Sequence, residues 1–328
     1  MSKIIVGIHG LGNKPPKDLL QKWWRQSLRE GFRCIDKPQV FFDFELVYWA
    51  DILHEKPLDI NITDPENPLF LIEPYLPGRQ IDEEPQGPLR KKIMGYLERQ
   101  MDKLFLNDDM TLNFSSITDK IIKRYFKDME AYYAFADPEN KTDVKLRRDE
   151  IRNRLAETLR KHRDKEILLL SHSMGSIIAY DVLFHTAPDV TVDTFITAGS
   201  PLGLPVIIGR IFAEQQKKVA NFDKVRTPEN VKRNWFNFAD PEDTIAFDAT
   251  LNDDYAENSQ NIRAIDITVR NNYENRGVKN SHKIYGYLRT PEMARVIYDF
   301  QHRGQPRMKQ KLADRLNSLL SGFIEKYK

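Results

Sequence analysis

Residues 167–184 read ILLLSHSMGSIIAYDVLF and combine an apolar run, a short polar segment and a second apolar run. The first four residues are apolar and predict a short strand that is buried on both faces. Residues 174–184 are apolar on nearly every side, as in a helix that packs under a sheet. The polar residues between the two leave only enough chain for a sharp turn. The stretch therefore predicts a strand, a tight turn and a buried helix in direct succession.

Five further apolar runs predict strands of the same buried kind. Helical patterns separate most of them: residues 18–30 carry apolar side chains at helical spacing, and in residues 143–163 Ile151, Leu155 and Leu159 recur every four residues. Strands that alternate with helices predict an α/β fold, with a mostly parallel sheet of about six strands and helices on both faces. The six predicted strands are residues 4–8, 44–49, 167–170, 194–197, 235–238 and 262–269.

Residues 51–140 interrupt this alternation. Seven prolines between positions 57 and 88 exclude a helix or a central strand there. After the prolines, residues 89–106 and 117–135 predict two amphipathic helices that are rich in aromatic side chains. The predicted division is a core of residues 1–50 and 141–328, and a Pro-rich and helical cap insertion of residues 51–140.

Ser173 stands at the centre of the predicted turn. A serine on a strained turn between a strand and a helix is the setting in which a hydroxyl acts as a nucleophile, in the pattern G-x-S-x-G. The positions two before and two after this serine must be small, because they pass close to neighbouring backbone. Gly175 meets this requirement, and Ser171 stands where the pattern has glycine. Ser173 is therefore the candidate nucleophile.

A serine hydroxyl reacts only with the help of a base, and the base needs an acid to orient it. In sheets with this strand, turn and helix, the acid and then the histidine follow the serine along the chain. His282 and His302 come late enough. His282 lies in a polar loop after the last predicted strand, at the edge where open α/β sheets gather their sites. His302 ends a predicted helix, so His282 is the candidate base.

The turn after the predicted strand 235–238 holds the candidates for the acid. Asp243 is followed by a small residue and then by apolar residues, and this context favours it. Asp240 precedes a proline, and we expect its side chain to satisfy the local backbone of a turn. Asp240 remains the alternative acid, and Glu242 is a third candidate.

Four segments hold the loop after the first strand, the candidate nucleophile, the candidate acids and the candidate base. In chain order they are residues 9–12 (HGLG), Ser173, residues 240–246 (DPEDTIA) and His282. In these segments the chain resembles the α/β-hydrolase superfamily, and in particular its lipase- and esterase-like members. The resemblance implies a serine hydrolase that cleaves small-molecule or lipid carboxylic esters through an acyl-enzyme without a cofactor. It also implies the strand order 2-1-3-4-5-6.

Two other functions fit the same residues. One is a catalytically silent hydrolase fold that serves as a binding module, and the presence of Ser173, Asp243 and His282 together argues against it. The other is a peptidase or an acyltransferase that uses the same three side chains, and no residue of the sequence excludes it.

The resemblance also assigns the donors that would hold a tetrahedral oxyanion. One is the backbone N–H of Met174, directly after the nucleophile, and the other is that of Leu11, in the turn after the first strand. His172 is expected to pack or hydrogen bond beside the site. Leu202 belongs to residues 199–205, which either shape an acyl pocket or form a simple turn. The residues predicted to line the substrate site are His9, Gly10, His172 and Leu202.

The turn after the first strand also has the glycine spacing of a phosphate-binding loop, from Gly7 to Gly12. In such a loop, Lys and then Ser or Thr follow the second glycine directly. Here Asn13, Lys14 and Pro15 follow instead. Nucleotide binding is therefore not expected.

Composition narrows the possible partners. Lys plus Arg number 50 against 48 Asp plus Glu, a net charge of +2, which gives no reason to expect nucleic acid. His54, His162 and His185 share no ligand spacing with Cys, Asp or Glu, so no metal is expected. The single cysteine and the lack of a signal or membrane-spanning run make the cytoplasm the expected location. Residues 309–324 have helical amphipathic spacing and are expected to pack on the body, with a dimer or a peripheral membrane contact as the alternatives. The sequence leaves the oligomeric state open.

Overall fold

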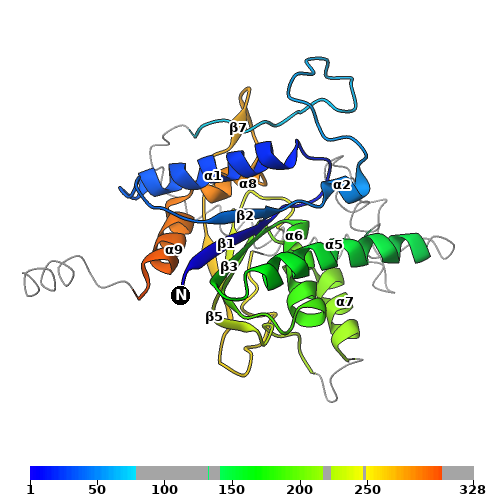
Figure 1. Ribbon diagram of the computed structural model, residues 1–328, viewed down its shortest axis with the longest axis vertical. Coiled ribbons are helices and arrows are strands. Elements are labelled where there is room, and N and C mark those ends of the chain that lie inside the picture. Colours follow the sequence, from blue (N-terminus) through cyan, green and yellow to red (C-terminus); the bar gives the residue numbers. More distant parts are fainter. Residues whose placement is uncertain (79–131, 133–140, 217–222, 247–248, 305–328) are drawn as a thin grey trace, which may run out of the picture.

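Six strands form the central sheet: β1 (Lys3–Ile8), β2 (Phe44–Val47), β3 (Glu166–His172), β4 (Val192–Ala198), β5 (Val231–Ala239) and β6 (Ala264–Thr268). Their order across the sheet is β2-β1-β3-β4-β5-β6, and every neighbouring pair is parallel (Figure 1). The computed structural model describes residues 1–78, 132, 141–216, 223–246 and 249–304. The predicted α/β class and the strand order that the resemblance implies are both confirmed.

Alternate residues of the strands face two separate hydrophobic clusters. In β1, Ile4, Val6 and Ile8 belong to one cluster and Ile5 to the other. Helices on the first side are α5 (Lys141–Lys161), α6 (Met174–Asp181) and α7 (Pro205–Gln216), and those on the second side are α1 (Lys17–Cys34), α8 (Ile284–Leu288) and α9 (Pro291–His302). Helices therefore cover both faces of the sheet, as predicted (Figure 1). Among the helices of the described residues, none combines the length and the apolar character that a membrane crossing requires.

Several short elements differ from the prediction. Pro205, expected to close a pocket-shaping segment or a turn, instead begins α7, because the fixed φ of proline suits the first turn of a helix. Other elements that the sequence patterns do not reveal are α2 (Ala50–Leu53), α8, the π-helical turn η2 (Val182–Thr186), the 3-10 turn η3 (Pro201–Gly203) and the hairpin of β7 (Glu274–Asn275) and β8 (Val278–Lys279).

Residues 69–78 of the expected insertion, which we call the strap, pack on the side of the sheet that α1 and α8 cover. Tyr75 of the strap lies between Trp23 of α1 and Tyr285 of α8, with ring centroids 6.4 Å and 5.7 Å away. Of the residues in the expected helices 89–106, 117–135 and 309–324, only Tyr132 lies within the described residues. The division into core and cap therefore stays a prediction.

Candidate active site

Ser173 connects β3 to α6 through a single strained residue. Its φ is +55° and its ψ is −131°, a conformation that is unfavourable for any residue with a Cβ. Its backbone N–H donates a hydrogen bond to the carbonyl oxygen of Ala198 on the neighbouring strand (3.0 Å). The turn therefore places the Ser173 side chain at the carboxyl end of the sheet, where it is almost fully enclosed.

The two small residues around Ser173 differ in how strictly their size is fixed. A Cβ at Gly175 would lie 2.7 Å from the carbonyl oxygen of Ile8, so only glycine fits there. Ser171, which replaces the glycine of the pattern, is buried, and its hydroxyl donates to the carbonyl oxygen of Ile196 (2.8 Å). Because this hydroxyl has an acceptor, the departure from the pattern leaves the turn intact.

His282 lies between Ser173 and Asp243. Its Nε2 is 3.0 Å from Ser173 Oγ, and its Nδ1 is 2.9 Å from each carboxylate oxygen of Asp243. Because Nδ1 faces two acceptors, it carries the proton, and Nε2 accepts the hydrogen bond from the serine hydroxyl. The other candidate base, His302, lies at the end of α9 with its Nδ1 2.9 Å from the carbonyl oxygen of Tyr298.

Asp243 is surrounded by donors. Its side chain is fully enclosed, and it accepts hydrogen bonds from the backbone N–H of Ile245 (2.9 Å), the N–H of Ala246 (3.3 Å) and the hydroxyl of Tyr287 (2.7 Å). Burial and the nearby Asp243 charge raise the pKa of Tyr287 well above its ordinary value, so this hydroxyl remains a donor. Gly199 has φ +54°, and a Cβ there would lie 2.8 Å from Asp243 Oδ2. The position therefore requires glycine.

The other two candidate acids have different partners. Asp240 accepts the backbone N–H of Glu242 (2.8 Å) on one oxygen and that of Asn271 (2.6 Å) on the other, as expected of a turn-forming residue. Glu242 pairs with Lys279. Asp243, by contrast, has both carboxylate oxygens 2.9 Å from the imidazole.

The turn after β1 approaches Ser173 at Gly10. A Cβ on Gly10 would lie 2.7 Å from Ser173 Cβ and 3.1 Å from its Oγ, so the nucleophile leaves room only for glycine. The buried ring of His9 shapes this turn. Trp49 donates its backbone N–H to His9 Nε2 (3.0 Å), and Nδ1 therefore carries the proton that it donates to the Gly10 carbonyl oxygen (2.8 Å). Burial, and then the nearby Lys14 charge, lower the pKa of His9 well below its ordinary value, which keeps the ring neutral.

This arrangement sets the direction of the Leu11 amide. In a trans peptide the N–H points away from the carbonyl of the same plane, so the Gly10 carbonyl that bonds to His9 turns the Leu11 N–H in the opposite direction. Met174 follows Ser173 directly and begins α6. Within the described residues, no hydrogen bond engages the N–H of Leu11 or that of Met174. Both amides are therefore available to a ligand atom.

The structure gives His172 and Leu202 different positions. His172 Nε2 donates to the backbone carbonyl oxygen of His282 (2.8 Å), and the two rings lie 4.9 Å apart. Burial, and then His282, lower the pKa of His172 well below its ordinary value. Leu202 is completely buried in the core, and its carbonyl oxygen accepts the hydroxyl of Tyr255 (2.9 Å). Leu202 is thus a packing residue in this structure, whereas His172 holds the backbone of His282.

Two residues beside the site were not predicted from the sequence. Tyr287 lies in the short helix α8, and a five-residue helix leaves no periodicity to detect. Gly199 offers a weak signal, because a glycine directly after a buried strand often marks a position that needs a positive φ.

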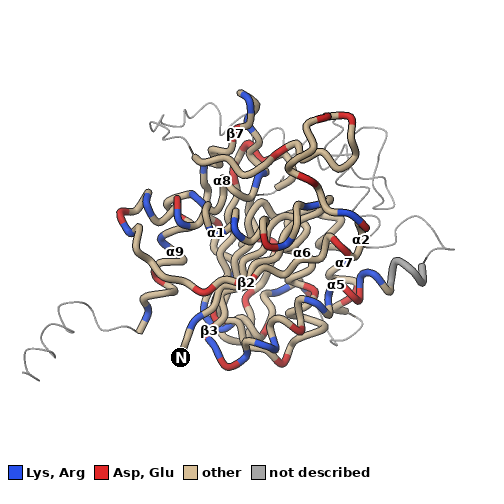
Figure 2. Tube along the Cα trace, turned by 45° about the horizontal axis from the view of Figure 1, so that its top comes forward, with Lys and Arg blue, Asp and Glu red and all other residues tan. Residues whose placement is uncertain are grey.

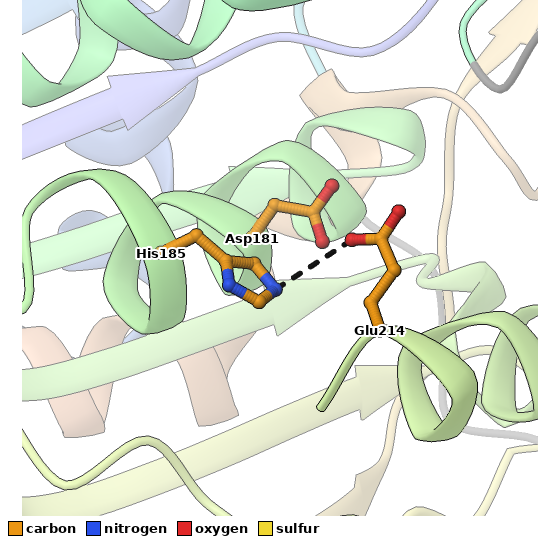
Figure 3. Close-up of side chains that lie close together, drawn as sticks. All are labelled: Asp181, His185 and Glu214. Carbon is orange, nitrogen blue, oxygen red and sulfur yellow. Dashed lines mark ion pairs between the residues drawn. The ribbon is translucent and has the colours of Figure 1, made fainter. Parts of the chain in front are cut away.

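Asp181, His185 and Glu214 form a second polar cluster, from the end of α6, from η2 and from α7 (Figure 3). One ligand atom of each residue lies within 4.8 Å of the others. The prediction that His185 has no carboxylate at ligand spacing is therefore wrong, because Asp181 lies four positions before it. Arg152 Nη2 lies 2.5 Å from Asp181 Oδ2 and 3.9 Å from Glu214 Oε2. Arg148 Nη1 lies 3.9 Å from Glu214 Oε1, so two guanidinium groups balance the two carboxylates and would repel a metal cation between them. We interpret the cluster as an ion-pair network and assign no metal to it.

Neither a known protein family nor a curated protein sequence matches this chain. The function is therefore inferred from the geometry of the site.

Proposed function

We propose that this protein is a serine hydrolase that cleaves carboxylic esters, with Ser173 as nucleophile, His282 as base and Asp243 as the orienting acid. One observation carries the proposal: a single imidazole lies within hydrogen-bond distance of a serine hydroxyl on a strained turn (3.0 Å) and of a buried carboxylate (2.9 Å). A nucleophile next to a base that a third group orients is the arrangement that activates a hydroxyl.

The contacts suggest a sequence of proton transfers. His282 Nε2 takes the proton of Ser173 as Oγ attacks the ester carbonyl, and the N–H groups of Leu11 and Met174 hold the oxyanion. The imidazolium, held by Asp243, then gives the proton to the departing alcohol. Water attacks the acyl-enzyme in the same way and releases the carboxylic acid. The chemistry is complete with protein groups and water.

A fluorophosphonate probe tests this function directly, because it labels only a serine whose hydroxyl is activated. We expect one probe molecule per chain, on Ser173, and hydrolysis of nitrophenyl esters. Ser173→Ala should lose labelling and lower kcat on the order of 10⁶-fold while the fold remains intact. Ser176→Ala, a buried serine in the first turn of α6, serves as the matched control and should keep both activities.

Other outcomes assign other functions. A folded chain that takes no label is a binding module rather than an enzyme. A labelled chain that prefers peptides, or that transfers the acyl group to an added alcohol, is a peptidase or an acyltransferase. Nitrophenyl ester, thioester and peptide substrates therefore belong in the same panel.

We further propose that residues 51–140 cap the site. Two described parts of this region support the proposal, because the strap contacts the loop of His282 and Tyr132 is buried against α6. Replacement of residues 79–131 by a Gly-Ser linker long enough to connect residue 78 to Tyr132 leaves both contacts in place. It should change the ranking of esters by acyl chain length more than the rate on the acetyl ester. An unchanged ranking in a folded variant assigns this region to an interaction surface instead.

A further inference from the structure

The strap holds a carboxylate beside the loop that carries His282. Glu73 Oε1 accepts a hydrogen bond from Asn280 Nδ2 (2.5 Å), and Glu73 Oε2 accepts one from Lys283 Nζ (3.0 Å). Asn280 and Lys283 lie on either side of His282 in the chain. A single side chain, far away in sequence, therefore contacts both flanks of this histidine.

Asn280 extends this contact to His282 itself. Its Oδ1 accepts the backbone N–H of His282 (2.9 Å), while its own N–H donates to the carbonyl oxygen of Tyr273 (3.0 Å). On the other side, His172 donates to the His282 carbonyl oxygen (2.8 Å). Both backbone polar groups of His282 are thus held by side chains, and Glu73 orients one of these side chains.

We propose that Glu73 is a positioning residue: by fixing Asn280 and Lys283, it keeps the His282 imidazole aligned between the serine hydroxyl and the aspartate. Glu73 acts mainly through these two neighbours: its charge also interacts electrostatically with His282, but no hydrogen bond joins it to Ser173, His282 or Asp243 in the described structure. The inference rests on the proposed function, since alignment of the ring affects a rate only if the ring acts as a base.

Stability alone gives little reason for this ion pair. The side chains of Glu73 and Lys283 are 32% and 24% exposed, and pairs as accessible as this contribute little to folding. Burial alone would raise the pKa of Glu73, but Lys283 and the Asn280 amide together lower it below its ordinary value, so the carboxylate is ionised at neutral pH. Catalytic alignment is far more sensitive, because a displacement of about 1 Å can cost about 100-fold in rate.

Glu73→Ala separates these two roles. On a nitrophenyl ester we expect kcat to fall about 10-fold to 100-fold with KM unchanged, and the rate of fluorophosphonate labelling to fall in parallel. Thermal unfolding should stay close to that of the wild type. Glu73→Gln keeps an oxygen that accepts from Asn280 but loses the charge that faces Lys283. Its kcat should therefore lie between those of the wild type and of Glu73→Ala. Glu66→Ala changes an exposed glutamate on the same Pro-rich segment and is the matched control.

Several results would overturn the proposal. A folded Glu73→Ala variant that labels at the wild-type rate shows that the carboxylate positions nothing, and a raised KM with normal kcat makes it a substrate contact. If the alanine variant does not fold, Glu73→Gln is judged by the same two rates.

A wild-type chain that takes no label contradicts the proposed function and leaves the positioning role to be tested by proton NMR. The His282 Nδ1 proton, hydrogen bonded to Asp243, should give a low-field resonance that moves or broadens in Glu73→Ala. An unchanged resonance contradicts the positioning role.

Discussion

Two aspartates, three positions apart at the end of β5, have different surroundings. Each carboxylate oxygen of Asp240 accepts a backbone N–H, one from Glu242 and the other from Asn271. Asp243 directs its oxygens to the imidazole, to two amides and to a hydroxyl. Tyr287 contacts both residues, since its hydroxyl donates to Asp243 and accepts the backbone N–H of Asp240 (3.0 Å). Tyr287 thereby fixes the position of the turn relative to α8.

Asparagine substitutions distinguish the two carboxylates. Asp243→Asn should lower kcat by roughly 10⁴-fold, because the amide no longer holds the correct tautomer or supports the imidazolium. Asp240→Asn should leave kcat near the wild-type value and cost about 1 kcal/mol of stability, for one weakened hydrogen bond. Steady-state kinetics and urea unfolding of both variants check this. The reverse pattern would make Asp240 the acid.

The residues of the site differ in how far sequence can predict them. Ser173, His282 and the turn at 240–246 all follow strands of one parallel sheet, and parallel strands bring their carboxyl ends to one edge. The choice between Asp240 and Asp243 could not be made in this way, because it depends on which backbone N–H groups fill each carboxylate. The burial of Leu202 could not be predicted either, because an apolar residue after a strand can line a pocket or belong to the core.

At the scale of elements, a buried ion-pair network joins α5 to α6. Arg152 of α5 reaches Asp181, the last residue of α6 (2.5 Å), and both contact the hydroxyl of Tyr132 (3.0 Å each). All three side chains are buried, so each polar atom depends on the others for its hydrogen bonds. The helix α6, which directly follows Ser173, is thus fixed at its far end by a residue of the proposed cap.

Loss of one hydroxyl should weaken this connection. Tyr132→Phe removes the acceptor of Arg152 Nε and one donor to Asp181 while the direct pair of the two remains, so the free energy of unfolding should fall by about 1–3 kcal/mol. The midpoint and slope of urea unfolding measure this decrease in the free energy of unfolding. Tyr298→Phe, on the partly exposed side of α9, should change stability by less than about 0.5 kcal/mol. Equal effects in the two variants would show that the network contributes no more than an ordinary surface hydroxyl.

Most of the long elements were predictable, whereas α7 and the short elements were not. Each strand of the sheet is apolar because helices cover both faces, so its buried run stands out against the polar turns. The helix α7 was not predicted, because residues 199–205 were expected to shape a pocket or form a turn, although proline is suited to a first helical turn. The proposed cap could be delimited by its prolines, but contacts such as that of Tyr132 with Asp181 leave no periodicity in the sequence.

At the scale of the whole molecule, acid should destabilise the fold through two buried imidazoles. Burial lowers the pKa of His9 and His172 well below the ordinary value near 6.5, and the charges of Lys14 and His282, respectively, lower it further. Below pH 6.5 the unfolded chain binds protons that the folded chain does not. The free energy of unfolding therefore decreases as the pH is lowered. The loss is up to ~1.4 kcal/mol per pH unit for each histidine.

Urea unfolding at pH 7.5, 6.5 and 5.5 measures this dependence. The midpoint should fall as the pH falls, and His172→Gln, which cannot titrate, should flatten the trend. A midpoint that stays constant from pH 7.5 to 5.5 would show that neither ring is held neutral by the fold.

The loop of His282 has a consequence for inactivation by denaturants. Its backbone is held mainly by side chains, since Asn271 Nδ2 donates to the carbonyl oxygens of Ser281 (2.8 Å) and Lys283 (2.7 Å). Such a loop opens at a lower free energy than the strands beneath it. Activity should therefore disappear at urea concentrations that leave the fluorescence of the buried Trp24 and Trp235 unchanged, and should return on dilution. Coincident loss of activity and fluorescence would mean that the loop unfolds only together with the core.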